Sequence, residues 1–462
     1  MLLVLFISIC CQVASASEKV HVYPAPAGEE LSPSFVVNVD GEPTPVYGCK
    51  VAPAEKERRW KAMDDLAHSG DYFEKGAFVY FDIKGPVVIT VTCPEVIQSA
   101  RILPTSYGII PKTDGKTLTF TLDVPRNLTL EINGDWVHSL HLFASPLETD
   151  EPRADDPNVV YFGPGIHEIK EGIRIRDGQT LYIAGGAILR GTGTTGGAVV
   201  SLLGAHVTLR GRGIIDGMLC PIHSRNLLHV QGSDIRIEGV ILRDSSTWNV
   251  PIRKSDRVLV KNLKILGNRA NSDGIDICNS RDVTVDGCFV RTLDDLIVVK
   301  SDKGQGEVHR VIVKNCVLWN QLAHALSIGA ELRENVEDVS FTDCDIIHDT
   351  SREWSLRIFH SDSATITHVK FESIRIEESH KLISLWINKA IWSKDAERGH
   401  IDGVEFKNIT AIGSPLGVEL RGFDADHLVE NINFQDVVLN GKPLSSGEIT
   451  RNPFVRQVIV HP

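Results

Sequence analysis

The second half of the chain carries a six-residue phrase that recurs every 23 to 35 residues. Apolar residues occupy its first, third and sixth positions, except that the first copy ends in Arg212, and the two-residue gap before the sixth position contains a polar residue or glycine. The copies begin at Val207, Ile235, Val258, Val283, Val311, Val339, Val369, Val404 and Ile432. Such alternation predicts a short strand that ends in a turn. A recurring period of this length indicates a solenoid.

One coil of such a solenoid cannot bury its own apolar side chains, so successive coils must stack. We therefore predict an all-β fold, a parallel β-helix. The sixth position of three successive copies is Cys288, Cys316 and Cys344, spaced 28 residues apart. We expect these cysteines to lie above one another inside the coil. A β-helix presents a long groove lined by stacked side chains, which suits a linear polymer.

The N-terminal part of the chain has a different pattern. Residues 17–150 contain short alternating runs separated by turn residues, which predicts a β-sandwich domain. One stretch within it, Glu55 to His68, is helical in pattern. Residues 151–158 are acidic and proline-rich and suit a linker, and residues 159–462 would form the catalytic β-helix domain. We expect the sandwich to be a packing or capping module rather than an independent binding module.

Residues 1–16 read as a secretory signal peptide. The run LLVLFISI is an apolar core, and Ala14-Ser15-Ala16 fits a small-x-small cleavage site. The alternative is a buried N-terminal strand. The run is too short to span a membrane, and no later stretch is long and apolar enough to do so. This pattern predicts a secreted or periplasmic protein.

Charge and cysteine content narrow the possible partners. The formal net charge is -12, which argues against general binding to nucleic acid or to acidic membranes. Nine cysteines less Cys10 and Cys11 of the predicted leader leave seven, and none shows the close spacing of a zinc site. We expect neither a metal nor another cofactor. Cys49 and Cys93 are the candidate disulfide pair.

The main chemical signal is a group of aspartates in the middle coils. Asp273 lies 22 residues before Asp295, so stacked coils would place their backbones about 4.8 Å apart. Asp294 adjoins them, although strict alternation would turn it to the opposite face unless the chain bends there. Three close carboxylates repel one another and raise at least one pKa. Glycoside hydrolysis needs such a protonated acid beside an ionised base. The alternative is that they are ordinary turn aspartates.

The next two coils add His324 and Arg357. A histidine beside a carboxylate pair can tune the protonation of the acid. An arginine can grip a sugar hydroxyl or carboxylate in fork geometry. Each alone is more often a surface residue, but stacked on four consecutive coils the residues form a column.

This ordered column resembles glycoside hydrolase family 28, the polygalacturonase family, over roughly residues 159 to 440. The matching motifs are Asn271-Ser272-Asp273, Asp294-Asp295, Ala323-His324-Ala325 and Arg357-Ile358-Phe359. The resemblance implies a right-handed parallel β-helix and single-displacement hydrolysis of a polysaccharide or oligosaccharide with inversion. It makes Asp294 the general acid and lets Asp273 and Asp295 activate water. It further implies that His324 supports the protonation state of the acid, and that Asn271 and Arg357 belong to the substrate-binding site.

Two departures from the family pattern affect the expected substrate. Phe359 replaces the lysine that contacts the galacturonate carboxylate, and alanines replace both glycines beside the histidine. Losing a cation removes a charge-assisted contact, which leaves acidic and neutral glycans both open. Lys300 is an alternative cation or a solvated turn residue. Trp354, with Trp386 and Trp392, is a candidate for stacking on sugar rings or for core packing.

Three other functions remain open. The dextranase and isopullulanase group, family 49, resembles the chain in its β-helix, aspartate triad and N-terminal sandwich, and acts on neutral α-glucans. A polysaccharide lyase on the same scaffold needs a base and often calcium, but no basic cluster surrounds the aspartates. A non-catalytic glycan-binding solenoid is the third alternative.

Overall fold

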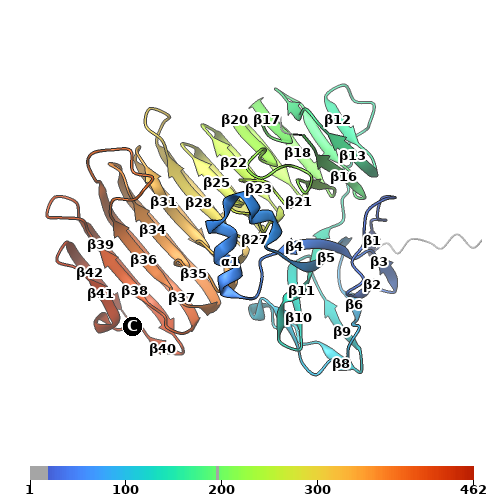
Figure 1. The fold of residues 1–462 in the computed structure, drawn as a ribbon, viewed down its shortest axis with the longest axis horizontal. Coiled ribbons are helices and arrows are strands. Elements are labelled where there is room, and N and C mark those ends of the chain that lie inside the picture. Colours follow the sequence, from blue (N-terminus) through green and yellow to red (C-terminus); the bar gives the residue numbers. More distant parts are fainter. Residues whose placement is uncertain (1–18, 194–196, 462) are drawn as a thin grey trace, which may run out of the picture.

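The chain folds into a small N-terminal β-domain packed against the side of a long β-helix (Figure 1). The structure, a computed structural model, describes residues 19–193 and 197–461. The signal peptide predicted at residues 1–16 lies outside the described residues.

The N-terminal domain is a β-sandwich of a six-stranded and a five-stranded sheet. The first contains β1 (Val20–Val22), β5 (Glu74–Ile83), β11 (Asp135–Pro146), β10 (Asn127–Ile132) and β7 (Ala100–Leu103), with β4 (Tyr47–Val51) paired to β5. The second contains β3 (Glu42–Thr44), β2 (Val36–Val39), β6 (Val87–Thr92), β9 (Thr117–Leu122) and β8 (Lys112–Asp114). Inward-facing apolar residues of both sheets share one core.

The helices are few and short. The predicted helical stretch forms α1 (Lys56–Asp64) and the 3-10 helix η1 (Leu66–Asp71), with a break at Asp65. The other 3-10 helices are η2 (Thr105–Tyr107) and η3 (Ser446–Glu448). Within the described ranges, none of these helices has the length and apolar character needed to cross a membrane.

The remaining 31 strands wind into a right-handed parallel β-helix, as predicted. Its strands pair from coil to coil in three lengthwise sheets. The repeat sheet contains β12 (Val159–Phe162), β15 (Thr180–Ile183), β18 (Thr208–Gly211), β20 (Leu228–Glu238), β23 (Asp256–Lys261), β26 (Arg281–Asp286), β29 (Val308–Lys314), β32 (Val336–Thr342), β35 (Thr365–Ser379), β37 (His400–Gly413), β39 (Val429–Leu439) and β42 (Val455–His461).

The other two sheets face the N-terminal domain and the candidate site. The docking sheet contains β13 (Gly165–Ile169), β16 (Ala187–Gly191), β19 (Ile214–Asp216), β21 (Ile241–Arg243), β24 (Lys264–Leu266), β27 (Phe289–Thr292), β30 (Val317–Asn320) and β33 (Asp345–Asp349). The site sheet contains β14 (Ile173–Ile175), β17 (Val200–Ala205), the start of β20, β22 (Val250–Arg253), β25 (Ile275–Cys278), β28 (Ile297–Ser301), β31 (Leu326–Leu332), β34 (Leu356–His360), β36 (Ile383–Ile387), β38 (Val418–Arg421) and β41 (Ile449–Arg451). The short β40 (Lys442–Pro443) pairs antiparallel with β39.

The fifth position of the repeated phrase turns the chain from the repeat sheet towards the docking sheet. Its backbone is left-handed in successive coils, with φ of 85° at Gly239, 51° at Asn262, 57° at Asn315 and 50° at Asp343. Glycine, asparagine and aspartate tolerate this conformation, whereas β-branched residues do not. The polar or glycine residue seen in the sequence pattern therefore meets a backbone requirement of the turn.

Side chains inside the coil stack in ladders. Cys288, Cys316 and Cys344 are fully buried free thiols, and Cys316 lies within hydrogen-bond reach of the other two. This confirms the predicted cysteine column. The third position of the later repeats builds a second ladder of stacked phenylalanine rings.

We expect Phe371→Ala to be strongly destabilising because this ring lies in the middle of the aromatic ladder. Its centroid is 4.9 Å from those of Phe341 and Phe406, and the residue is fully buried. Removing such a ring typically costs about 3–5 kcal/mol of unfolding free energy. Urea denaturation would measure the loss, with Phe423→Ala, whose residue is 42% exposed, as control. A loss below that of the control would contradict the ladder as a major source of stability.

The N-terminal domain covers the outer face of the docking sheet. Apolar residues of both partners, including Tyr47, Phe143, Ile214, Phe289 and Trp319, form a continuous buried cluster between them. The docking sheet therefore presents apolar side chains on both faces, one to the coil interior and one to the N-terminal domain.

Buried ion pairs cross the same interface. Arg212 Nε lies 2.8 Å from Asp82 Oδ1, and Arg243 Nη2 lies 2.8 Å from Glu29 Oε1. Breaking one member of a buried pair leaves an uncompensated charge, which is costly. The interface therefore holds the domain in one orientation relative to the β-helix.

The candidate disulfide is wrong, because Cys49 and Cys93 are both free, buried thiols. Cys49 belongs to the interface cluster between sandwich and β-helix, whereas Cys93 belongs to the core between the two sandwich sheets. Their side chains therefore pack in different apolar clusters.

Candidate active site

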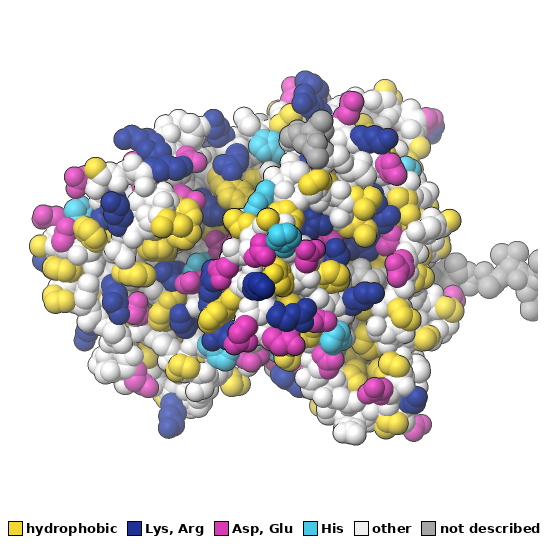
Figure 2. All heavy atoms as spheres, in the orientation of Figure 1, with side chains coloured by type: hydrophobic (Ala, Val, Ile, Leu, Met, Phe, Trp, Pro, Cys, Tyr) yellow, Lys and Arg dark blue, Asp and Glu magenta, His cyan; other side chains and the backbone are white. Residues whose placement is uncertain are grey.

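A cavity of about 390 Å³ opens over the site sheet, beside the α1 segment of the N-terminal domain (Figure 2). Its walls come from consecutive coils between β22 and β36. The structure brings seven of the eight predicted site residues to this pocket: Asn271, Asp273, Asp294, Asp295, Lys300, His324 and Arg357.

Trp354 is the predicted residue that the structure does not bring to the pocket. Its ring packs beside Gly417, and the ammonium group of Lys381 lies 6.0 Å from the ring centroid. The tryptophans that do line the pocket are Trp248, Trp386 and Trp392.

Coil stacking and a bend together assemble the three aspartates. The register of β25 with β28 pairs Ile275 with Ile297, which sets Asp273 beside Asp295. The chain bends between β27 and β28, and the Asp295 N–H donates to Asp294 Oδ1 at 2.9 Å. This is the bend that both aspartates require to reach one pocket. Each of the three carboxylates offers an oxygen within 4.8 Å of the others.

The neighbouring aspartates have opposite pKa shifts. Burial, reinforced by the charges of Asp273 and Asp295, raises the pKa of Asp294 well above its usual value. Burial would also raise the pKa of Asp295, but attraction to His324 and a hydrogen bond with it outweigh burial and lower that pKa. The pocket therefore holds a carboxylic acid beside a carboxylate, which is the pairing that acid–base catalysis requires.

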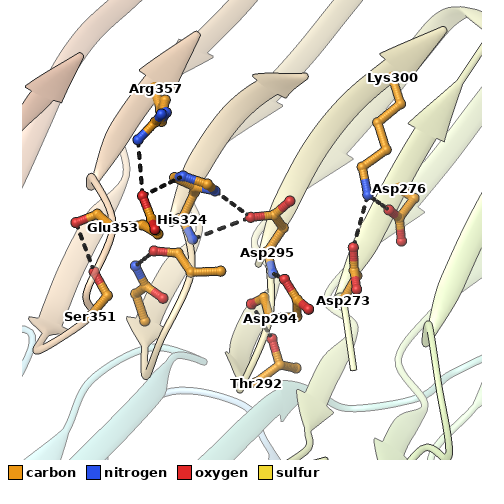
Figure 3. Close-up of polar contacts among 12 residues, drawn as sticks. Asp273, Asp276, Thr292, Asp294, Asp295, Lys300, His324, Ser351, Glu353 and Arg357 are labelled. Carbon is orange, nitrogen blue, oxygen red and sulfur yellow. Dashed lines mark hydrogen bonds and ion pairs between the residues drawn. The ribbon is translucent and has the colours of Figure 1, made fainter. Parts of the chain in front are cut away.

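Lys300 is a buried countercharge rather than a solvated turn residue. Its ammonium lies 3.0 Å from Asp273 Oδ2 and 3.0 Å from Asp276 Oδ1 (Figure 3). It also lies 4.3 Å from the ring centroid of Trp248. Burial would lower the pKa of Lys300, but the two aspartates outweigh burial and raise it well above its usual value. The lysine is therefore charged, and it neutralises part of the aspartate cluster.

His324 contacts the ionised aspartate and not the acid. Its Nδ1 lies 2.6 Å from Asp295 Oδ1, and its backbone N–H donates to the same oxygen at 3.3 Å. The resemblance predicted that the histidine supports the protonation state of the acid. The geometry makes this support indirect, because His324 stabilises ionised Asp295, whose charge raises the pKa of Asp294.

Glu353 joins His324 to Arg357 and was not predicted. Arg357 Nη1 donates to Glu353 Oε2 at 3.0 Å, and the same oxygen lies 4.0 Å from His324 Nε2 (Figure 3). The guanidinium also lies 4.7 Å from the ring centroid of Phe359. Arg357 therefore enters the pocket already paired with a carboxylate and stacked on an aromatic ring.

The N-terminal domain contributes one wall of the pocket through Met63 of α1. Ser69 of η1 accepts a hydrogen bond at 2.5 Å from the N–H of Ala270, immediately before the aspartate coil. Leu293 and Leu322 of the β-helix pack in a small apolar cluster with the same helical segment. The helical segment of the domain thus borders the pocket as well as packing on the β-helix.

The register between neighbouring coils would have been enough to predict one pocket residue that the sequence-based prediction missed, Trp248. Val250 pairs with Ile275, so Trp248 lies one coil before Asp273 at the equivalent position. Asp276 lies on β25, three residues after Asp273, and is fully buried. Glu353 and Met63 lie outside the strands of the site sheet, so coil register gives no signal for either.

The aspartate oxygens are close enough to bind a cation, since all three lie within 4.8 Å of one another. Such a cluster is a possible metal site only if its charge is otherwise unbalanced. Lys300 already supplies a positive charge to Asp273. The donor set therefore favours an internally balanced acid–base site over a dedicated metal centre.

Comparison with known proteins agrees with this geometry. The model of glycosyl hydrolases family 28 matches residues 170–452, which is more than half of the chain. An exopolygalacturonase of Zea mays is 24% identical over 214 residues, covering 44% of this chain and 50% of the relative. A probable polygalacturonase of Arabidopsis thaliana is 26% identical over 149 residues, covering 31% of this chain and 32% of the relative. The chain thus spans half or less of these relatives' length.

Solved structures share the fold at low sequence identity. An exopolygalacturonase from Thermotoga maritima superposes with a TM-score of 0.55 at 16% identity, covering 66% of this chain and 84% of that one. Dex49A from Penicillium minioluteum, a family 49 protein, has a TM-score of 0.55 at 12% identity and covers 95% of this chain and 96% of its own. Both predicted resemblances are therefore confirmed at the level of fold. The family match over the β-helix shows that the chain belongs to glycosyl hydrolases family 28.

Proposed function

We propose that this protein is a secreted, inverting glycoside hydrolase that cleaves a polysaccharide or oligosaccharide. One observation carries the proposal: adjacent carboxyl groups in a single pocket have opposite pKa shifts, raised at Asp294 and lowered at Asp295. Neighbouring carboxyl groups whose pKa values are shifted in opposite directions mark the acid and base roles of a glycosidase.

In the proposed mechanism, Asp294 donates its proton to the glycosidic oxygen as the bond to the anomeric carbon breaks. A water held between Asp273 and Asp295 attacks the anomeric carbon and gives its proton to Asp295. His324 keeps Asp295 ionised before the step, since its Nδ1 lies 2.6 Å from the carboxylate. Lys300 partly offsets the charge of Asp273, whose pKa burial raises, so Asp295 acts as the base while Asp273 borders the same water.

The distance between the carboxylates bears on whether hydrolysis inverts or retains the configuration of the anomeric carbon. Inverting enzymes typically separate acid and base by roughly 6.5–9.5 Å, to leave room for water. Here the oxygens lie within 4.8 Å of one another, closer to the roughly 5–5.5 Å of retaining enzymes, so the proposal of inversion rests on the family resemblance. A water can still bridge this gap with hydrogen bonds of about 2.8 Å to each acceptor. We place that water between Asp273 and Asp295, where Asp273 Oδ1 has no hydrogen-bond partner among the described residues.

The test is hydrolysis of a polymer panel by the purified full chain, followed by proton NMR of the first product. We expect reducing ends to be released from at least one of polygalacturonate, rhamnogalacturonan, dextran and pullulan. The new reducing end should first appear with inverted anomeric configuration. A retained anomer would contradict single displacement, and an ultraviolet-absorbing unsaturated product would indicate a lyase. Polymer binding without cleavage would favour a glycan-binding solenoid.

Export is part of the proposal and rests on the apolar leader pattern of residues 1–16. Expression of the full gene in a secreting host would test it. The medium should contain a chain that begins close after Ala16, as read by N-terminal sequencing. A chain that stays in the cytoplasm with its first residues intact would contradict export.

A further inference from the structure

We infer that the sugar bound in this pocket is neutral, and not a uronate; the inference rests on the proposed hydrolase function and names its substrate class. The pocket combines an aromatic wall with cations that are already paired to carboxylates.

The cations of the pocket have their partners inside the protein. Among the described residues, the cations that line it are Lys300, Arg352 and Arg357. Lys300 lies between two buried aspartates, and Arg357 is bound to Glu353 at 3.0 Å. Arg352 Nη1 lies 3.4 Å from Asp64 of the N-terminal domain. A sugar carboxylate would have to displace one of these partners to gain a charge-assisted hydrogen bond.

The carboxyl groups outnumber these cations. Five acidic side chains line the pocket, and they are Asp273, Asp294, Asp295, Glu331 and Glu353. With Asp294 protonated, four remain to ionise against Lys300, Arg352 and Arg357, together with His324, whose attraction lowers the pKa of Asp295. A uronate would therefore enter a pocket in which every cation already has a carboxylate partner, whereas a neutral sugar needs no free cation.

The aromatic wall supplies what a neutral sugar needs. Phe359 and Trp386 are register partners on β34 and β36, and their rings stack with centroids 5.4 Å apart at 16°. The guanidinium of Arg357 also lies over the Trp386 ring, 5.7 Å from its centroid. Both aromatic residues line the pocket and are partly exposed. Ligand sites of this type bind the apolar face of a ligand and orient it with a few polar groups.

The experiment compares matched neutral and acidic sugars without relying on turnover. Tryptophan fluorescence of the full-length Asp294→Asn variant is titrated with trisaccharides of galactose, glucose and rhamnose, and with trisaccharides of galacturonate and glucuronate. At least one neutral trisaccharide should bind about 10-fold or more tightly than either acidic one, since an unmet charged contact costs about that much. An acidic sugar that binds as tightly as the best neutral one, or no binding by any neutral sugar, would overturn the inference.

Two substitutions at one position separate charge from shape. Phe359→Lys adds an unpaired cation and should raise affinity for the acidic trisaccharides by about 10-fold. Phe359→Met removes the ring without adding charge, so it should weaken neutral binding and leave acidic binding unchanged. Equal effects of the two variants on the acidic sugars would count against the inference.

The result of the binding experiment can be told apart from the result of the test of the proposed hydrolase function. Tight neutral binding with no hydrolysis by the unsubstituted chain would overturn the hydrolase proposal and leave the binding result intact. Hydrolysis with polygalacturonate as the preferred polymer would support the hydrolase and overturn the neutral-sugar inference.

Discussion

Asp294→Asn should reduce turnover by about 10³-fold or more, because asparagine matches the carboxyl group in shape but cannot donate its proton to the leaving oxygen. The side chain is held by Asp295 N–H at 2.9 Å, a contact that the asparagine carbonyl can keep. The fold should therefore survive the change. Initial rates on the best polymer of the panel, together with a thermal unfolding curve, would measure both effects.

Asp282→Asn is the matched control for this substitution. Asp282 belongs to the same coil but lies on the repeat sheet, where it binds the exposed Arg310. Its substitution should leave turnover unchanged. If Asp294→Asn kept most of the activity, Asp294 could not be the general acid.

The opposite pKa shifts also predict the pH profile of the unsubstituted enzyme. Activity should appear as pH rises through the lowered pKa of Asp295 and disappear as pH rises through the raised pKa of Asp294. In Asp294→Asn the residual rate should lose its alkaline limb, because that limb reports the acid.

Lys300→Met should both inactivate and destabilise the protein. The lysine separates two buried aspartates at 3.0 Å each, and removing one partner of a buried charge pair costs about 3–5 kcal/mol. Methionine is unbranched like lysine but uncharged and one heavy atom shorter, so the ammonium contact with the Trp248 ring is lost as well. The loss would be read as a lower midpoint of thermal unfolding, with turnover measured in parallel.

The destabilisation should depend on pH in a defined direction. Without the lysine, Asp273 and Asp276 would have pKa values raised further by burial and by each other. A carboxyl group with a raised folded-state pKa binds more protons when folded, so stability falls as pH rises above its unfolded value. The loss should therefore be larger at pH 8 than at pH 5. An equal loss at both values, or one matched by the exposed Lys303→Met, would contradict the role of Lys300 as a countercharge.

Repetition made most of the fold readable from the sequence. The alternation within each phrase predicted the repeat sheet, and its recurrence every 23 to 35 residues predicted stacking. Cys288, Cys316 and Cys344 could therefore be placed inside the coil. The same stacking rule placed Asp273 beside Asp295. It works because each coil repeats the hydrogen-bonding register of the one before it.

The residues that escaped prediction are those whose positions depend on contacts outside the coil register. Met63 reaches the pocket only because the sandwich docks on the β-helix through pairs such as Arg212 with Asp82. Glu353 lies in the turn before β34, where its side chain meets His324 and Arg357. The sequence alone also could not distinguish Trp354 from Trp386, since only the register of β34 with β36 stacks the latter on Phe359.

The column arrangement of the site has an evolutionary consequence. The functional side chains are spread over consecutive coils, and the strand pairing that stacks these coils does not depend on which side chain stands at each position. The side chains of one coil can therefore change while those of the neighbouring coils stay the same. A chain of this kind can change its sugar preference by single substitutions at the edge of the pocket, without altering the catalytic acid and base.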